Sequence, residues 1–145
     1  MRSSLFAIAF GLSACGARAP VSDGGLCTET KSLDFTADLP VPGDEAYLCF
    51  GFAAAPFADR TLRGLTIAAP ASAPLVYHHI TLFAVAGPFE DGPCEAMPDG
   101  AVELDVWAPG GAPLVLPEGV ALRIPLGTQR LVAQAHVLRF TSSAT

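Results

Sequence analysis

Short apolar runs, each closed by Pro, Gly or Asp, are the feature that most limits what this chain of 145 residues can fold into. No stretch of a dozen residues in the body of the chain carries a convincing helical period. Gly (14) and Pro (13) together approach a fifth of the residues, which disfavours a helical bundle. The pattern predicts an all-β protein, an antiparallel sandwich of six or seven short strands. The predicted strands cover residues 47–52, 61–69, 75–86, 102–107, 120–125 and 131–140.

The composition limits the class of protein further. Hydrophobic residues make up 51% of the chain and charged residues 15%, which excludes a disordered protein and supports a real core. The length allows one domain. The formal charge of -6 argues against a nucleic-acid partner, because phosphates need a basic face.

The N-terminal 15 residues have the pattern of an export signal. One Arg is followed by an apolar stretch over residues 5–12 and by small residues ending in Cys15. This stretch is too short to span a bilayer as a stable helix. The tetrapeptide at 12–15 (LSAC) resembles a bacterial lipobox, which implies cleavage before Cys15 and diacylglycerol on its sulfur. The alternative is an ordinary secretory signal with a chance cysteine.

The resulting organisation has three parts. Residues 1–14 are a predicted lipoprotein signal peptide, residues 15–26 a Gly/Pro/Ser-rich tether, and residues 27–140 the β domain. With either kind of signal the mature chain leaves the cytoplasm, and with the lipid it is anchored to a membrane on the periplasmic or cell-surface side.

Export changes the meaning of the remaining cysteines, because pairing is the default in an oxidising compartment. The mature domain has three cysteines besides Cys15, namely Cys27, Cys49 and Cys94, so one of them has no partner within this set. Cys49 and Cys94 flank the apolar centre of the chain and are the favoured pair. Cys27 is then without a predicted partner.

Three histidines are the only ones in the chain, and two of them are adjacent within its longest apolar run. Neighbouring side chains on a regular strand point to opposite faces, so either one of His78 and His79 is buried or a bulge turns both toward one site. Each lost hydrogen bond of a buried imidazole costs about 1–3 kcal/mol. A metal ion relieves that cost by taking a lone pair from each ring.

His136 supplies a third nitrogen, on a predicted strand where it shares a face with Val132 and Gln134. Three imidazoles without a thiolate or carboxylate suit copper or zinc, and their spacing does not separate the two metals. For the adjacent pair alone, two satisfied or surface histidines are the commoner explanation.

Five short blocks around these histidines, taken in order, carry a family resemblance. They resemble the N-terminal domain of the copper type II, ascorbate-dependent monooxygenases, which include peptidylglycine α-hydroxylating monooxygenase and dopamine β-hydroxylase. The similarity runs from about residue 27 to residue 137. The blocks are YLC at 47–49, HH at 78–79, WAPG at 107–110, LPEGV at 116–120 and QAH at 134–136.

The resemblance implies two jelly-roll-like β domains, each with one copper ion. His78, His79 and His136 match the three ligands of the first copper, which receives electrons from ascorbate and passes them to a second copper. Dioxygen is activated at that second site and a substrate C–H bond is hydroxylated. Cys49 and Cys94 match a disulfide pair of the family, and Cys27 matches a cysteine whose partner lies beyond the third histidine.

The chain also departs from the family pattern. No His-X-His follows His136, Val137 stands where the family usually has Tyr, and the second copper domain is absent. The chain therefore looks truncated, and no residue is assigned to catalysis. The expected function is a copper domain for electron transfer, incomplete as an enzyme alone, with a second copper domain as its partner. The alternatives are a lipid-anchored copper-binding module without turnover and a degraded fragment that no longer binds metal.

Overall fold

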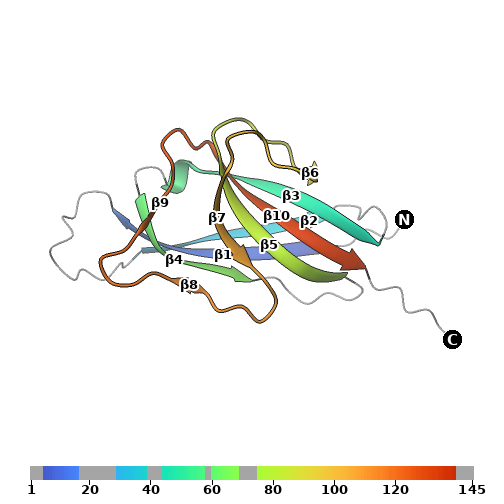
Figure 1. The fold of residues 1–145 in the computed structure, drawn as a ribbon, viewed down its shortest axis with the longest axis horizontal. Coiled ribbons are helices and arrows are strands. Elements are labelled where there is room, and N and C mark those ends of the chain that lie inside the picture. The colour runs from blue at the N-terminus through green and yellow to red at the C-terminus, as the bar shows by residue number, and fades with distance from the viewer. Residues whose placement is uncertain (1–4, 17–28, 39–43, 58–59, 69–74, 140–145) are drawn as a thin grey trace.

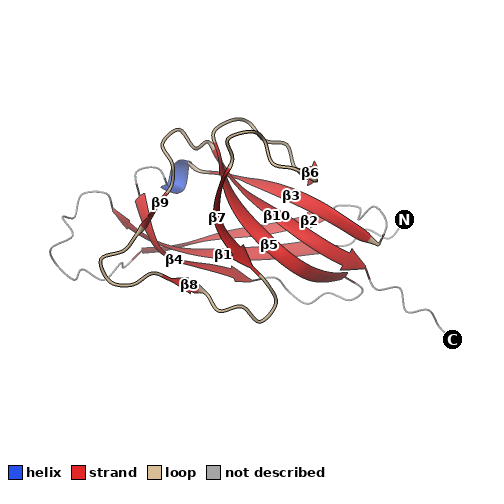
Figure 2. Ribbon diagram, viewed as in Figure 1, coloured by secondary structure: helices blue, strands red, loops and turns tan. Residues whose placement is uncertain are grey.

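The computed structural model describes residues 5–16, 29–38, 44–57, 60–68 and 75–139, which form two antiparallel β-sheets (Figures 1 and 2). The first sheet has the order β2-β1-β4-β8, with β9 also paired to β4. The second has the order β6-β3-β10-β5-β7. The elements of the first sheet are β1 (Leu5–Gly16), β2 (Glu29–Asp38), β4 (Arg60–Ala68), β8 (Leu114–Val115) and β9 (Leu122–Arg123). The second contains β3 (Glu45–Ala53), β5 (Leu75–Val85), β6 (Gly92–Pro93), β7 (Val102–Trp107) and β10 (Arg130–Arg139), and a short 3₁₀ turn, η1 (Ala55–Phe57), follows β3.

The core lies between the two sheets. Leu62, Leu65 and Ile67 of β4 pack in one cluster with inward side chains of the second sheet. Leu65 and Ile67 share a face because every second residue of a strand points the same way. Leu62 joins them because the register of β4 against β1 shifts between Ser13 and Ala14, which leaves Arg63 as an extra residue of β4. The second sheet contributes, among others, Leu48, Phe50, Ile80, Leu82, Leu131, Ala133, Ala135 and Val137. The all-β sandwich predicted from the sequence is therefore confirmed, whereas the jelly-roll order of connections stays a prediction.

Strand β10 is the centre of the second sheet and is buried on both faces. It pairs antiparallel with β3 on one side and with β5 on the other, and residues 131–137 are all buried. Its outward residues Val132, Gln134 and His136 lie opposite Gly51, Cys49 and Tyr47 of β3, which places these side chains on one face. The predicted shared face of β10 is confirmed.

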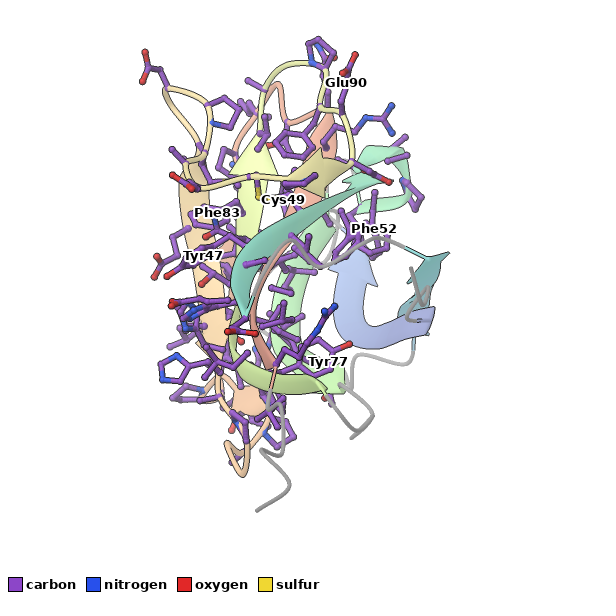
Figure 3. All side chains as sticks on the ribbon, turned by 90° about the vertical axis from the view of Figure 1, so that its right-hand side faces the viewer. Tyr47, Cys49, Phe52, Tyr77, Phe83 and Glu90 are labelled. Carbon is purple, nitrogen blue, oxygen red and sulfur yellow. A yellow bond between two sulfur atoms is a disulfide. The ribbon has the colours of Figure 1, made fainter. Side chains whose placement is uncertain are left out.

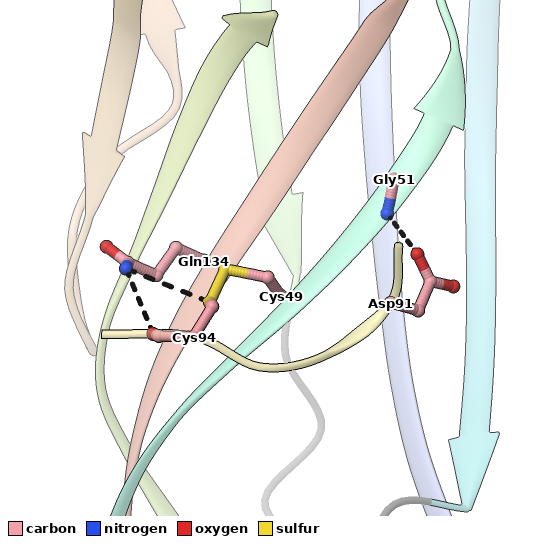
Figure 4. Close-up of a disulfide and its surroundings, with 5 residues drawn as sticks. All are labelled: Cys49, Gly51, Asp91, Cys94 and Gln134. Carbon is pink, nitrogen blue, oxygen red and sulfur yellow. Dashed lines mark hydrogen bonds between the residues drawn. A yellow bond between two sulfur atoms is a disulfide. The ribbon is translucent and has the colours of Figure 1, made fainter. Parts of the chain in front are cut away.

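A loop held by the predicted disulfide covers part of this outer face. Cys49 and Cys94 are bonded, with their Cα atoms 5.8 Å apart (Figure 4). They pack in one cluster with Val85 and Val132. The Gln134 side-chain amide donates to the Cys94 carbonyl at 3.4 Å, and Asp91 accepts from the Gly51 backbone N–H at 2.8 Å. The loop between β5 and β7 is therefore fastened to β3 by the disulfide and the Asp91 hydrogen bond, and to β10 by the Gln134 hydrogen bond.

Strand β7 departs from its predicted alternation. The sequence predicts Val102, Leu104 and Val106 on one face, but the register of β7 against β5 shifts between Leu82 and Phe83, so β7 has an extra residue. Leu104 packs against the core, whereas Val102 and Val106 are 44% and 50% exposed. The bulge, which depends on pairing with β5, overrides the local pattern.

The N-terminal strand is the largest difference from the sequence analysis. Residues 5–16 form β1, which lies between β2 and β4 in the first sheet, yet the predicted cleavage before Cys15 would remove most of this strand. An apolar run of this length fits both an export signal and a strand of a sheet, because the sequence pattern alone does not separate them. Most of the predicted tether, Cys27 and residues 140–145 lie outside the described residues. None of the helices in the described part of the chain is long and apolar enough to cross a membrane.

Candidate metal centre

The three histidines converge on the outer face of the second sheet. His78 and His79 come from β5 and His136 from the neighbouring strand β10. One potential ligand atom from each lies within 4.8 Å of the other two. The sequence predicted this set, and the structure brings all three together.

A β-bulge in β5 makes the convergence possible. His79 lies opposite His136, and Tyr77 lies opposite Val137, so His78 is the extra residue between two regular pairs. Both adjacent rings then approach His136, with centroid distances of 5.0 Å in each case. Of the two arrangements that the sequence left open, the bulge is the one present.

The same bulge lets Tyr77 point inward. Tyr77 is 4% exposed and belongs to the core cluster, on the side of the sheet away from Tyr47 (Figure 3). Burial raises the pKa of Tyr77 to about 12. Without the extra residue, the alternation would place Tyr77 and His79 on the same face.

The spacing of the β5 pair fits two ligands of one ion. Nδ1 of His78 and Nδ1 of His79 are 3.1 Å apart. Imidazole nitrogens bind transition metals at about 2.0–2.1 Å, so two of them on one ion lie about 3–3.5 Å apart. His78 is exposed and His79 is partly buried, so this side of the site is open to solvent.

His136 is the buried and most firmly held member. Its Nε2 lies 2.7 Å from Oε1 of Glu45, and its ring stacks on Tyr47 with a centroid distance of 4.3 Å and an interplanar angle of 7°. Glu45 and Tyr47 are two residues apart on β3, so one strand holds the ring both at its edge and on its face. The orientation of His136 is thus set before any ligand arrives.

The other nitrogen of His136 carries the strongest signal of a ligand. Nδ1 is buried and has no hydrogen-bond partner among the described residues. A carboxylate can only accept a hydrogen bond, so Nε2 carries the hydrogen and donates to Glu45, and Nδ1 holds the free lone pair of the neutral ring. A buried acceptor left unpaired costs about 1–3 kcal/mol, and a metal ion would remove that cost. The donor set therefore fits a metal ion.

The surroundings of His79 keep this ring available as a ligand. Burial lowers the pKa of His79 below its usual 6.5, and the neighbouring His136 and His78 lower it further. A lowered pKa keeps this imidazole neutral to a lower pH. Neutral imidazole is the form that binds metals, so at His79 burial and the two neighbouring rings favour a metal ion over a proton.

Comparison with known proteins leaves the family open: no family model, no curated protein and no solved structure matches this chain. The resemblance to copper monooxygenases therefore stays a prediction from the short sequence blocks. What the structure supplies independently is a three-histidine cluster that could hold a metal ion and the Cys49–Cys94 disulfide.

Two residues of the site were missed at the level of sequence. The sequence pattern assigns no site role to Glu45 or Tyr47, although both contact His136. Their alternation on β3 was readable, but its pairing with β10 was not. For Cys15, the predicted lipid attachment residue, the structure places the backbone in β1 and does not describe the side chain.

Proposed function

We propose that this chain is a copper domain of the ascorbate-dependent monooxygenase type, which holds one copper ion with His78, His79 and His136 and uses it for electron transfer. The observation that carries the proposal is the buried, unpartnered Nδ1 of His136, whose ring centroid lies 5.0 Å from those of His78 and His79. The ordered sequence blocks around these residues support the family.

The donor set suits either copper or zinc. Three neutral imidazoles accommodate both Cu(I) and Cu(II), and the ion supplies a one-electron redox change. Zinc also accepts three histidines, so the sequence resemblance decides for copper here. Ascorbate is the proposed electron donor, on the strength of that resemblance alone.

The protein's part in this function is to hold the ligands in place. His136 is fixed by Glu45 and Tyr47 and lies on the central strand, while His78 is exposed and gives an external reductant access. Within the described residues only this group of three His, Cys, Asp or Glu side chains meets the geometry of a metal site. Hydroxylation of a substrate therefore calls for a second copper domain as partner.

The function is tested by redox cycling of the copper-loaded chain. After removal of unbound Cu(II), anaerobic ascorbate is expected to abolish the Cu(II) electron paramagnetic resonance signal, and ferricyanide to restore it. The copper content after gel filtration is expected to be the same in both states, since the three imidazoles suit both. Copper that is lost on reduction, or that ascorbate does not reduce, contradicts an electron-transfer role.

A lipid-anchored copper-binding module without turnover is the second candidate. The single cluster among the described residues favours it, because storage or delivery needs only one site. Such a module is expected to give up Cu(I) to a chelator or partner instead of cycling. The redox experiment therefore separates the two functions.

The proposed export and lipid anchor lead to a prediction about the mature N-terminus. In bacterial cells, mass spectrometry is expected to find a chain beginning at an acylated Cys15, and Cys15→Ser is expected to release the protein from the membrane fraction. Two acyl chains give durable anchoring, which one chain does not. A mature chain that still contains residues 5–14 contradicts cleavage and makes β1 a permanent strand.

A further inference from the structure

We propose that Glu45 is a positioning residue of the metal centre, which presents Nδ1 of His136 to the ion and stabilises Cu(II) relative to Cu(I). This inference rests on the proposed copper site and adds to it a residue that sets its redox preference. No sequence block of the family resemblance includes a role for Glu45. The structural basis is the 2.7 Å contact between Oε1 of Glu45 and Nε2 of His136.

The contact selects one of two ring orientations. A half-turn of an imidazole about its Cβ–Cγ bond exchanges the positions of Nδ1 and Cδ2. Stacking on Tyr47 holds the ring plane but tolerates both orientations, because the plane is unchanged by the turn. Only the orientation with Nε2 beside the carboxylate keeps the 2.7 Å hydrogen bond, and that orientation leaves Nδ1 as the buried free acceptor.

The contact also selects the tautomer. The carboxylate accepts a hydrogen bond from the Nε2–H group, so the neutral ring carries its hydrogen on Nε2 and its lone pair on Nδ1. A metal-bound histidine whose other nitrogen donates to a carboxylate is a more basic ligand. The tautomer required for binding is therefore already set in the metal-free protein.

The charge of Glu45 gives the redox preference. The three ligands are neutral, so Glu45 brings a negative charge to the edge of His136. Its side chain is 62% exposed and its carboxylate is not part of the group of converging ligand atoms. It therefore acts through the imidazole and not as a fourth ligand. A negative charge and a more basic imidazole both stabilise the doubly charged ion more than the singly charged one.

Strand pairing explains why Glu45 is in position. In the β3–β10 register, Tyr47 lies opposite His136 and Glu45 lies opposite Leu138, so Glu45 is one alternate position further along the same face. This diagonal separation is within reach of a long side chain. Alanine at the same position keeps the strand but removes the contact.

The test compares Cu(II) and Cu(I) affinities, measured separately by chelator competition, in the full chain and in Glu45→Ala, Glu45→Gln and Glu118→Gln. Glu45→Ala is expected to weaken Cu(II) binding by about 10- to 100-fold, as the loss of an outer partner does. Cu(I) binding is expected to weaken less. A 10-fold fall in the ratio of the affinities raises the copper potential by about 59 mV.

The two other variants separate the hydrogen bond from the charge. Glu45→Gln keeps an acceptor for Nε2 but removes the charge, so an intermediate potential is expected. Glu118 is exposed and follows Pro117, whose carbonyl accepts a hydrogen bond from Arg63 of the first sheet. Glu118→Gln is expected to leave both affinities unchanged. It controls for the change in net charge. Thermal unfolding of each metal-free variant checks the fold.

Each outcome has a defined meaning. If the ratio of Cu(II) to Cu(I) affinity is unchanged in Glu45→Ala, this inference is overturned, whether both affinities fall equally or neither falls. In that case the proposed function still stands, provided that the unmodified chain binds copper. If the unmodified chain binds no copper, the proposed function is overturned and this inference with it.

Discussion

Replacing His136 with alanine is expected to weaken copper binding more than the loss of a hydrogen-bond partner of a ligand does. Losing such a partner weakens binding by about 10- to 100-fold. His136 is the ligand that the fold holds most firmly, since it is buried, stacked on Tyr47 and hydrogen-bonded to Glu45. Its loss leaves two histidines on a solvent-facing bulge. Chelator competition with Cu(I) and Cu(II) measures the change.

A matched control lies two residues earlier on the same strand. Gln134 shares the outer face with His136 and is similarly buried, but its amide contacts Cys94 and not the histidine cluster. Gln134→Ala is expected to lower the stability of the fold with little effect on copper affinity. Equal losses of affinity in the two variants contradict a ligand role for His136 and indicate a general disturbance of β10.

Removing the disulfide with Cys49→Ala and Cys94→Ala together is expected to lower the free energy of unfolding by about 4 kcal/mol. The two cysteines are 45 residues apart in sequence, and closing a loop of that length restricts the unfolded chain by this amount. Urea unfolding, monitored by circular dichroism, measures the change. Reduction of the unmodified chain provides the control and is expected to give a similar loss.

A change below about 1 kcal/mol contradicts this role of the disulfide. It would mean that the loop between β5 and β7 is held mainly by its other contacts, such as the Asp91 hydrogen bond to Gly51. A loss of copper affinity without a loss of stability would instead point to a direct influence of the disulfide on the site through Gln134.

The sequence predicted the main strands because they are short apolar runs closed by Pro, Gly or Asp, along which side chains alternate between the two faces. Residues 47–52, 61–69 and 131–140 closely match β3, β4 and β10, and the three histidines followed from their rarity and their apolar surroundings. These signals lie within a few neighbouring residues. The face shared by Gln134 and His136 followed from the same alternation.

Features that depend on pairing between distant strands were not predictable in this way. The bulge at His78 exists only in the register of β5 against β10, so the sequence left two arrangements open. Glu45 is 91 residues from His136 in the chain, and only the pairing of β3 with β10 brings them together. The bulge in β7 likewise arises from its register against β5.

The N-terminal segment shows a different limit. Residues 5–16 are apolar and small enough both for an export signal and for a strand between β2 and β4, so the sequence pattern does not choose between them. Physical chemistry permits each in its own setting. Which of the two forms in the cell depends on whether a signal peptidase cuts before Cys15.

Copper stoichiometry is the most direct test of the central claim that the three histidines form a metal centre. The full chain and a His78→Ala/His79→Ala/His136→Ala variant are loaded with copper, freed of unbound metal and analysed for metal and protein. One copper per chain that is lost in the triple variant is the expected result. Copper in the unmodified chain no higher than in the triple variant contradicts the claim, and the chain is then a remnant whose histidines no longer bind metal.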